Sequence, residues 1–247
     1  QVAEHSHEAP ARAPHALVHV PEGFVASEPW DLVIFLHGWN GCVNVLMRPG
    51  RTRCMEGTGP ERDGWDLAGA FDEAGINALF LMPQLAFRRR EGSAGRFAEE
   101  AYAEGFVNAV AERVEPWPTT APRRIVVAAH SAGFESALAW IEHGGLPIDE
   151  VILFDALYAG TETFARWASI AGRRLVSIHT GRGSTARQSR RLARLAQRAG
   201  LAVGQSLSAD APVVVMETSA PHREVPRAHL ADCLGADRPR TSATENQ

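Results

Sequence analysis

Three residues with the functional groups of a nucleophile, an acid and a base stand far apart in the chain, each after an apolar run. Ser131 follows Ile-Val-Val-Ala-Ala-His, Asp155 follows Val-Ile-Leu-Phe, and His222 comes shortly after Val-Val-Val-Met. A hydroxyl, a carboxylate and an imidazole can together carry out nucleophilic attack with proton transfer, provided that they meet in space. Such chemistry requires a fold that brings the three residues to one place.

The chain alternates between short apolar runs, typical of buried strands, and longer amphipathic segments, typical of helices. Strands are predicted at residues 15–20, 31–36, 77–82, 124–129, 150–154, 174–178 and 212–216, and helices at 64–75, 97–114, 132–143, 161–171, 185–199 and 226–234. This alternation predicts an α/β domain with a mainly parallel central sheet and helices on both faces. The carboxyl ends of such strands share one edge, where ligands bind, and Ser131, Asp155 and His222 all follow strand ends.

The remaining segments are predicted to lie outside this 15–235 domain or to cover it. Residues 1–14 are rich in Ala, Pro, His and Glu and are expected to form a flexible lead-in, and residues 236–247 a flexible tail. Residues 48–61 are the longest expected loop, which we predict to cover part of a site.

The composition excludes several classes of protein. The 247 residues carry a formal net charge of -4, which gives no indication of a nucleic-acid partner. No apolar run approaches the ~18 residues of a membrane span. The cysteines have no metal-ligand spacing, so no metal site is predicted. No feature of the sequence predicts an oligomeric state.

The location of the protein is predicted from two features. Cys42 and Cys54 flank a Gly- and Arg-rich segment and could form a disulfide in an exported protein, while unpaired thiols in a reducing compartment are the alternative. The chain begins at Gln1 rather than Met, as expected after removal of a preceding segment such as a signal peptide. A periplasmic or secreted location fits both features, and a cytoplasmic location is the alternative.

The residues around Ser131 resemble the nucleophile elbow of the α/β-hydrolase superfamily, written Gly-x-Ser-x-Gly. The segment here is Ala129-His130-Ser131-Ala132-Gly133, between a predicted strand and a predicted helix. The sharp turn requires small residues two positions to either side of the serine, and Ala129 keeps the small size where the motif has its first glycine. A serine that caps a helix is the structural alternative.

The resemblance covers about residues 16–234 and implies the three-layer α/β-hydrolase fold, with acyl transfer to Ser131. His37-Gly38-Trp39 resembles the oxyanion loop, so the backbone N–H groups of Trp39 and Ala132 are the implied oxyanion donors. His37 is interpreted as a structural histidine, hydrogen-bonded beneath this loop. Residues 83–97 resemble a poorly characterised bacterial branch of the superfamily. No metal or organic cofactor is implied.

Asp155 is the predicted acid of the triad. In many members of the superfamily the acid follows the strand after next from the nucleophile, but that strand ends here in His179-Thr180-Gly181. Asp155 ends the strand directly after the nucleophile helix, a placement also known in the superfamily. A turn-capping aspartate is the alternative role, and Glu217 and Asp210 are weaker candidates for the acid.

His222 is the predicted base, because a loop after the last strand can bring its imidazole to Ser131. His229 is its rival, in a segment of helical register where side chains point less freely into a cleft. The remaining histidines are expected at the surface or near the N-terminus.

These residues predict a serine hydrolase, and a carboxylester hydrolase above the alternatives. Trp39, Phe134 and Tyr158 are the predicted substrate-binding residues, with Trp65 beside them, and core packing is the alternative role. No long insertion follows the strand that precedes Asp155, so an open cleft suited to small-molecule or polymeric esters is expected. An amidase or peptidase with the same triad and a catalytically silent binding protein are the alternative functions.

Overall fold

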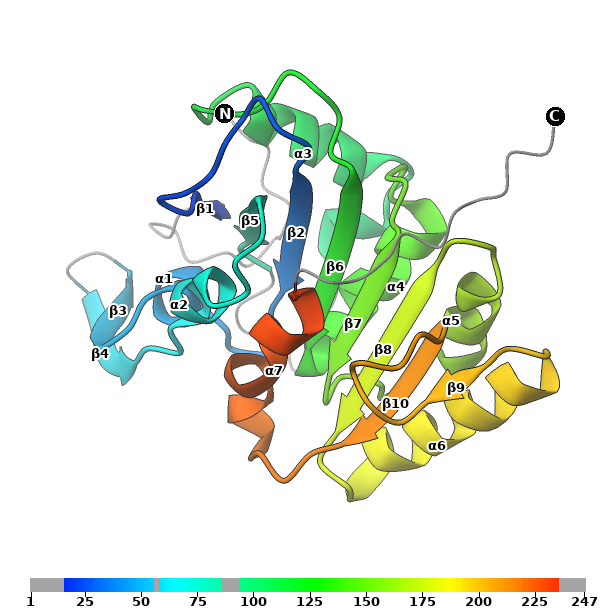
Figure 1. The fold of residues 1–247 in the computed structure, drawn as a ribbon. Coiled ribbons are helices and arrows are strands. Elements are labelled where there is room, and N and C mark those ends of the chain that lie inside the picture. The colour runs from blue at the N-terminus through cyan, green and yellow to red at the C-terminus, as the bar shows by residue number, and fades with distance from the viewer. Residues whose placement is uncertain (1–15, 56–57, 86–93, 236–247) are drawn as a thin grey trace, which may run out of the picture.

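The computed structural model describes residues 16–55, 58–85 and 94–235 (Figure 1). The sheet at its centre has eight strands in the order β1-β5-β2-β6-β7-β8-β10-β9. Within this sheet β1 pairs antiparallel with β5, and the other pairs are parallel. The segments predicted to be a flexible lead-in and tail, 1–14 and 236–247, lie outside the described residues.

Apolar runs become the strands of this sheet, as predicted, with bounds that shift by one or two residues. The strands are β1 (Ala16–His19), β2 (Asp31–Leu36), β5 (Ala78–Pro83), β6 (Arg124–His130), β7 (Glu150–Phe154), β8 (Arg174–His179), β9 (Val203–Gly204) and β10 (Val213–Glu217). The two-residue β9 was not predicted, because so short an edge strand has no alternation of its own.

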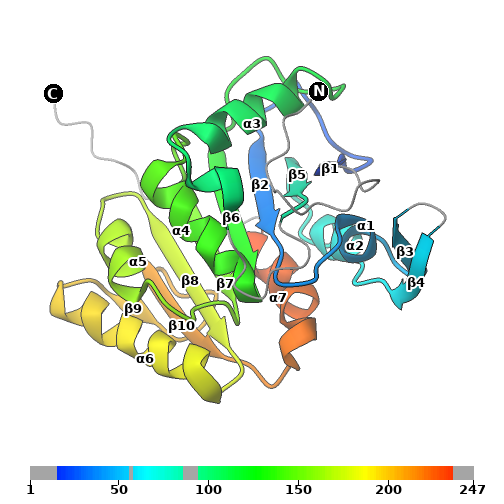
Figure 2. The same cartoon turned by 180° about the vertical axis from the view of Figure 1, so that it is seen from behind.

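Helices cover both faces of the sheet and complete a three-layer fold (Figures 1 and 2). One face is covered by α3 (Tyr102–Ala111), α4 (Phe134–His143), α5 (Thr161–Ala168) and α6 (Gly183–Arg198). The other face is covered by α1 (Val43–Met47), α2 (Leu67–Asp72) and α7 (Val225–Leu234). The predicted α/β architecture is therefore confirmed.

Two apolar cores hold these layers together, one on each face of the sheet. Successive side chains of a strand point to opposite faces, so Leu32, Ile34 and Leu36 of β2 join the first core while Val33 and Phe35 join the second. Every residue of β2 is buried, which explains why the strand reads as a continuous apolar run after its first residue.

Residues 48–61 do not form the predicted loop. They contribute most of a two-stranded antiparallel hairpin, β3 (Arg51–Met55) with β4 (Thr58–Asp63), which follows the short helix α1. A disulfide between Cys42 and Cys54 ties β3 to the residue before α1. The hairpin escapes prediction because Arg, Thr, Gly and Pro dominate it, so that no apolar alternation marks its strands.

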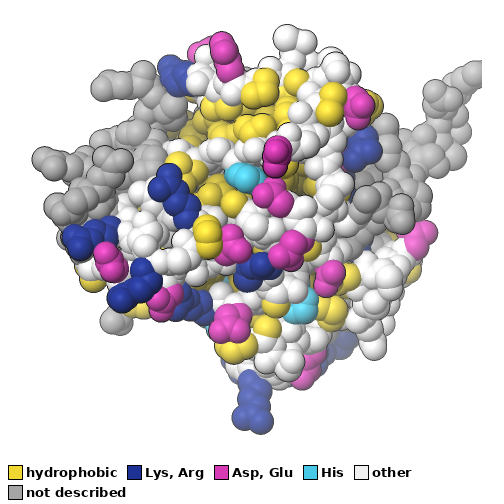
Figure 3. Space-filling model, turned by 60° about the vertical axis from the view of Figure 1, so that its left-hand side comes forward, with side chains coloured by type: hydrophobic (Ala, Val, Ile, Leu, Met, Phe, Trp, Pro, Cys, Tyr) yellow, Lys and Arg dark blue, Asp and Glu magenta, His cyan; other side chains and the backbone are white. Residues whose placement is uncertain are grey.

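Charged side chains of both signs are intermixed on the face drawn in Figure 3. A nucleic-acid site would require basic side chains gathered into one patch or stripe, and this face does not offer one. Among the described residues, no helix combines the length and apolar character that a membrane crossing needs.

Candidate active site

The register of the central strands brings the predicted site residues to one edge of the sheet. Leu36 of β2 pairs with Ala129 of β6, and His130 pairs with Phe154 of β7. Phe154 in turn pairs with Ile178 of β8. The residues that follow these strand ends, among them Ser131 and Asp155, therefore emerge side by side.

Ser131 occupies a sharp turn between β6 and α4. Its φ of 53° lies in the left-handed region, which costs about 1–2 kcal/mol for a residue with a side chain. Gly133 lets this turn pack against the end of β2, since a β-carbon there would lie 2.2 Å from the carbonyl oxygen of Leu36. A serine in this conformation departs from the extended backbone of an ordinary helix cap and has the geometry expected of a nucleophile elbow.

The oxyanion loop packs directly against the candidate nucleophile. A β-carbon added to Gly38 would lie 2.7 Å from Cβ and 3.3 Å from Oγ of Ser131. Only glycine allows this close approach, which places the peptide between Gly38 and Trp39 beside the hydroxyl. The predicted oxyanion loop and Ser131 are therefore direct neighbours.

His222 and Asp155 form a hydrogen-bonded pair. Nδ1 of His222 donates to Oδ2 of Asp155 over 2.7 Å. A carboxylate cannot donate in return, so this bond places the proton on Nδ1 and leaves Nε2 as the basic nitrogen. The side chain of His222 is 42% exposed while that of Asp155 is 5% exposed. A partly exposed imidazole is therefore hydrogen-bonded to a buried carboxylate.

Two threonines complete the surroundings of Asp155. Oγ1 of Thr185 donates to Oδ1 over 2.6 Å, Oγ1 of Thr180 donates to Oδ2 over 3.1 Å, and the Thr180 N–H donates to Oδ1 over 3.3 Å. Burial raises the pKa of Asp155, but the hydrogen bonds from His222 and Thr185 and the charge of His222 outweigh it and lower the pKa to about 2. Asp155 is therefore an anion at any pH at which His222 could act as a base.

Ser131 and His222 lie on the wall of one pocket of about 540 Å³. Its other residues come from the oxyanion loop, α1, the hairpin and the segments beside Ser131 and His222: Gly38, Trp39, Asn40, Gly41, Cys42, Val45, Leu46, Arg62, Asp63, Trp65, His130 and Arg223. Tyr158, in the loop after β7, does not line this pocket. Ser131 and His222 are therefore accessible from the same cavity.

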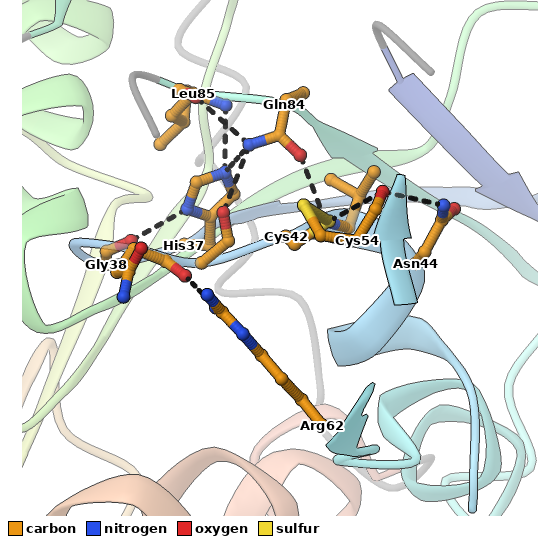
Figure 4. The surroundings of a disulfide bond; sticks show 11 residues. His37, Gly38, Cys42, Asn44, Cys54, Arg62, Gln84 and Leu85 are labelled. Atoms are coloured by element: carbon orange, nitrogen blue, oxygen red, sulfur yellow. Dashed lines mark hydrogen bonds between the residues drawn. A yellow bond between two sulfur atoms is a disulfide. The ribbon is translucent and has the colours of Figure 1, made fainter. Parts of the chain in front are cut away.

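His37 has the contacts predicted for a structural histidine. It is 2% exposed, and its Nδ1 donates to the carbonyl oxygen of Gly38 over 2.8 Å. Its Nε2 accepts from the Leu85 N–H and from Nε2 of Gln84, each over 2.9 Å (Figure 4). Burial lowers the pKa of His37 to about 4, so the ring is neutral and fastens the oxyanion loop to the end of β5.

Gln84 is a second support of this loop that sequence reasoning missed. Its Nε2 also donates to the carbonyl oxygen of Gly41, and its Oε1 accepts from the Val43 N–H at the start of α1 (Figure 4). The only signal in the sequence was its position directly after an apolar strand, where a fully buried amide must find partners in the backbone.

His130 is buried, contrary to the expectation that the remaining histidines lie at the surface. It is 5% exposed, and its Nε2 donates to the carbonyl oxygen of His222 over 3.0 Å. Its ring lies edge-on to Trp65 at 5.2 Å and 4.6 Å from the ring of His222. Burial lowers the pKa of His130 to about 3, so it is a neutral support for the loop that carries His222. His179, at 4% exposed, is buried as well.

The rival base and rival acids lie elsewhere. Nε2 of His229 is hydrogen-bonded to Oγ1 of Thr218 over 2.8 Å, and the ring lines a different cavity. That cavity, of about 1140 Å³, is larger and also includes Asp210. It lies beside the residues that precede β8 and β10, at the opposite edge of the sheet from Ser131. Glu217 is an exposed residue at the end of β10.

The predicted substrate-binding residues have different surroundings. Trp39 is 48% exposed and lines the pocket together with Trp65. Phe134 packs into the core below, with its ring 5.9 Å from that of Tyr158. The structure thus gives Phe134 the core-packing role that was its alternative, while Tyr158 is 37% exposed beside it.

No protein-family description matches the sequence, and no curated protein matches it. Solved structures are similar in three dimensions: a ferulic acid esterase matches with a TM-score of 0.60 over 89% of this chain and 90% of its own, at 11% identity. The chain has the α/β-hydrolase fold. Two further α/β-hydrolase-fold structures also match, a thermostable esterase (TM-score 0.52, 14% identity, 87% of this chain) and the Pyrococcus horikoshii acylaminoacyl peptidase (TM-score 0.50, 13% identity, 87%). This chain spans 56% and 37% of those two chains, respectively.

In terms of the α/β-hydrolase fold, the candidate acid Asp155 follows β7 rather than β8. Thr180 occupies the end of β8, and instead of a carboxylate it offers an N–H and a hydroxyl to Asp155. The threonine at this strand end was visible in the sequence, but its role depends on a contact between neighbouring strands that no local pattern reveals.

Proposed function

We propose that this protein is a serine hydrolase that cleaves carboxylic esters through an acyl-enzyme on Ser131. The observation that carries the proposal is the combination of a strained Ser131 with a His222–Asp155 pair on the same pocket. Strain of this kind persists only where the surrounding structure imposes it, and it is concentrated at functional sites.

In the proposed reaction, Nε2 of His222 takes the proton of the Ser131 hydroxyl while Oγ attacks the ester carbonyl carbon. The backbone N–H groups of Trp39 and Ala132 stabilise the negative oxygen of the tetrahedral intermediate. His222 then returns the proton to the departing alkoxide, which leaves as an alcohol. Water, deprotonated by His222, attacks the acyl-enzyme and releases the carboxylic acid and free Ser131.

Asp155 keeps the proton of the neutral His222 ring on Nδ1, so that Nε2 is free to act as the base. It also stabilises the imidazolium that forms during acylation and again during deacylation. Its lowered pKa, to about 2, supports this role because the carboxylate keeps its charge throughout. Asp155 itself takes no proton.

The proposed preference for esters over amides follows from the open shape of the pocket. Only the short loop from Asp155 to Gly160 separates β7 from α5, so no inserted domain covers Ser131 from that side. An open pocket accepts leaving groups of different size but gives little help in protonating a poor leaving group such as an amine. Of the three similar structures named above, two are esterases and one is a peptidase, so both bond types belong in the test.

The proposal is tested by labelling with a fluorophosphonate and by hydrolysis of p-nitrophenyl esters against the corresponding p-nitroanilides. Labelling of the native protein, its loss in Ser131→Ala, and faster cleavage of esters would support the proposal. Ser136→Ala is the matched control, because Ser136 is a buried serine on α4 whose hydroxyl has no hydrogen-bond partner among the described residues. Faster cleavage of anilides would indicate an amidase, and an unlabelled, folded native protein would indicate a binding protein.

A further inference from the structure

Two guanidinium groups line the pocket beside Ser131, and ester hydrolysis alone uses neither of them. Arg62 comes from the end of β4, and Arg223 directly follows His222. The hairpin and the segment that carries the candidate base therefore each bring one positive charge to the same pocket.

Both arginines donate to backbone carbonyl oxygens. Nη1 of Arg62 donates to the carbonyl oxygen of Asn40 over 3.0 Å (Figure 4). Nη2 of Arg223 donates to the carbonyl oxygen of Asp63 over 2.7 Å, and its guanidinium lies 5.5 Å from the centre of the Trp65 ring. Carbonyl dipoles and an aromatic face orient a guanidinium without neutralising its charge.

Asp63, which lines the pocket, and Asp155 each have a partner of their own. The Asp63 carboxylate, on a side chain that is 76% exposed, lies 3.7 Å from Nε of Arg51. The Asp155 carboxylate is bonded to His222 below. Arg223 makes no ion pair with any carboxylate of the described residues. Its charge is therefore available to a ligand in the pocket.

Trp65 contacts both the Arg223 guanidinium and the residue that precedes Ser131. The centre of the Trp65 ring lies 5.5 Å from the Arg223 guanidinium and 5.2 Å from the centre of the His130 ring, and His130 directly precedes Ser131. An acyl chain attached to Ser131 can lie along Trp65 with its far end at Arg223. A planar carboxylate at that end matches the two-pronged donor geometry of a guanidinium.

We propose that the pocket selects esters whose acyl group ends in a carboxylate, with Arg223 as the specificity-determining residue. This inference rests on the proposed hydrolysis at Ser131. It adds to it a substrate class, the monoesters of dicarboxylic acids, in which one carboxyl group is esterified and the other is free.

The test compares two esters of equal chain length, p-nitrophenyl pentanoate and mono-p-nitrophenyl glutarate, which differ in a terminal methyl or carboxylate. The measured quantity is the ratio of kcat/KM for glutarate to that for pentanoate. We expect a ratio above one for the native protein. Arg223→Gln should lower it about tenfold, mainly through the KM for glutarate, since one charge-assisted hydrogen bond is lost. Arg223→Glu should lower it further, and added salt should lower it in the native protein.

Arg227→Gln is the matched control, because Arg227 lies on the adjacent helix α7, paired with Glu73 and outside the pocket. Its ratio should equal that of the native protein. Hydrolysis of pentanoate with the same ratio in native protein and Arg223→Gln would overturn the carboxylate preference and leave the proposed hydrolysis standing. Failure to hydrolyse either ester, without labelling of Ser131, would overturn the proposed function and this inference with it.

Discussion

His130 offers the sharpest test of how the candidate base is held. Its Nε2–H is the described donor to the carbonyl oxygen of His222, over 3.0 Å in a buried setting. In His130→Leu that carbonyl loses its partner, which costs about 1–3 kcal/mol of stability. The loop then relaxes, and a shift of His222 by about 1 Å lowers kcat on the order of a hundredfold. KM should change little, because no substrate contact is assigned to His130.

His130→Gln separates positioning from packing, since the amide nitrogen can donate where the imidazole Nε2–H did. We expect Gln to recover most of the kcat that Leu loses. The assay is steady-state hydrolysis of a p-nitrophenyl ester, read as kcat and KM separately, with thermal unfolding in parallel. His229→Leu serves as the control, because its ring bonds to Thr218 outside the pocket, and its kcat should equal that of the native protein. A folded His130→Leu with native kcat would refute the reasoning.

Three further predictions concern charge, cross-linking and pH. Asp155→Asn should lower kcat on the order of 10⁴-fold with little change in KM, because the amide favours the wrong imidazole tautomer; a loss below tenfold would contradict this role. Replacing both Cys42 and Cys54 by Ala should lower the free energy of unfolding in urea by about 3 kcal/mol, from the entropy of the closed loop, and make it insensitive to reductant; equal stability would contradict it. His37 has a folded pKa of about 4, below its unfolded value of about 6.5, so its contribution to stability is complete above pH 6.5. About 3 kcal/mol is lost as the pH falls from 6.5 to 4, and equal urea midpoints at pH 7 and pH 4.5 would refute it.

Much of the sheet could be predicted because its central strands are buried on both faces. A strand such as β7, with five buried residues between helices, has to be almost entirely apolar, and such a run stands out in the sequence. The α1 helix is only five residues long and has no room for a helical period, so it was missed. The β3–β4 hairpin was missed because its polar residues show no apolar alternation.

The candidate triad could be predicted because each member follows a strand, and parallel strands place such residues together. The residues that hydrogen-bond to the members of this candidate triad could not be predicted. Thr185 reaches Asp155 from the start of α6, and His130 reaches the backbone of His222 across 92 positions in the chain. A threonine or histidine at these positions has no local signature, because its partner is chosen by the packing of separate elements.

The hairpin that forms one wall of the pocket begins and ends at neighbouring positions in the fold. The Gly64 N–H donates to the carbonyl oxygen of Gly50, and the Asp66 N–H donates to that of Arg48, so the two ends of the excursion meet. An inserted segment whose two ends lie side by side can be lengthened, shortened or exchanged without moving the strands that flank it. A different hairpin grafted between these ends would thus change one wall of the pocket while the central strands that position Ser131 and Asp155 stay in place.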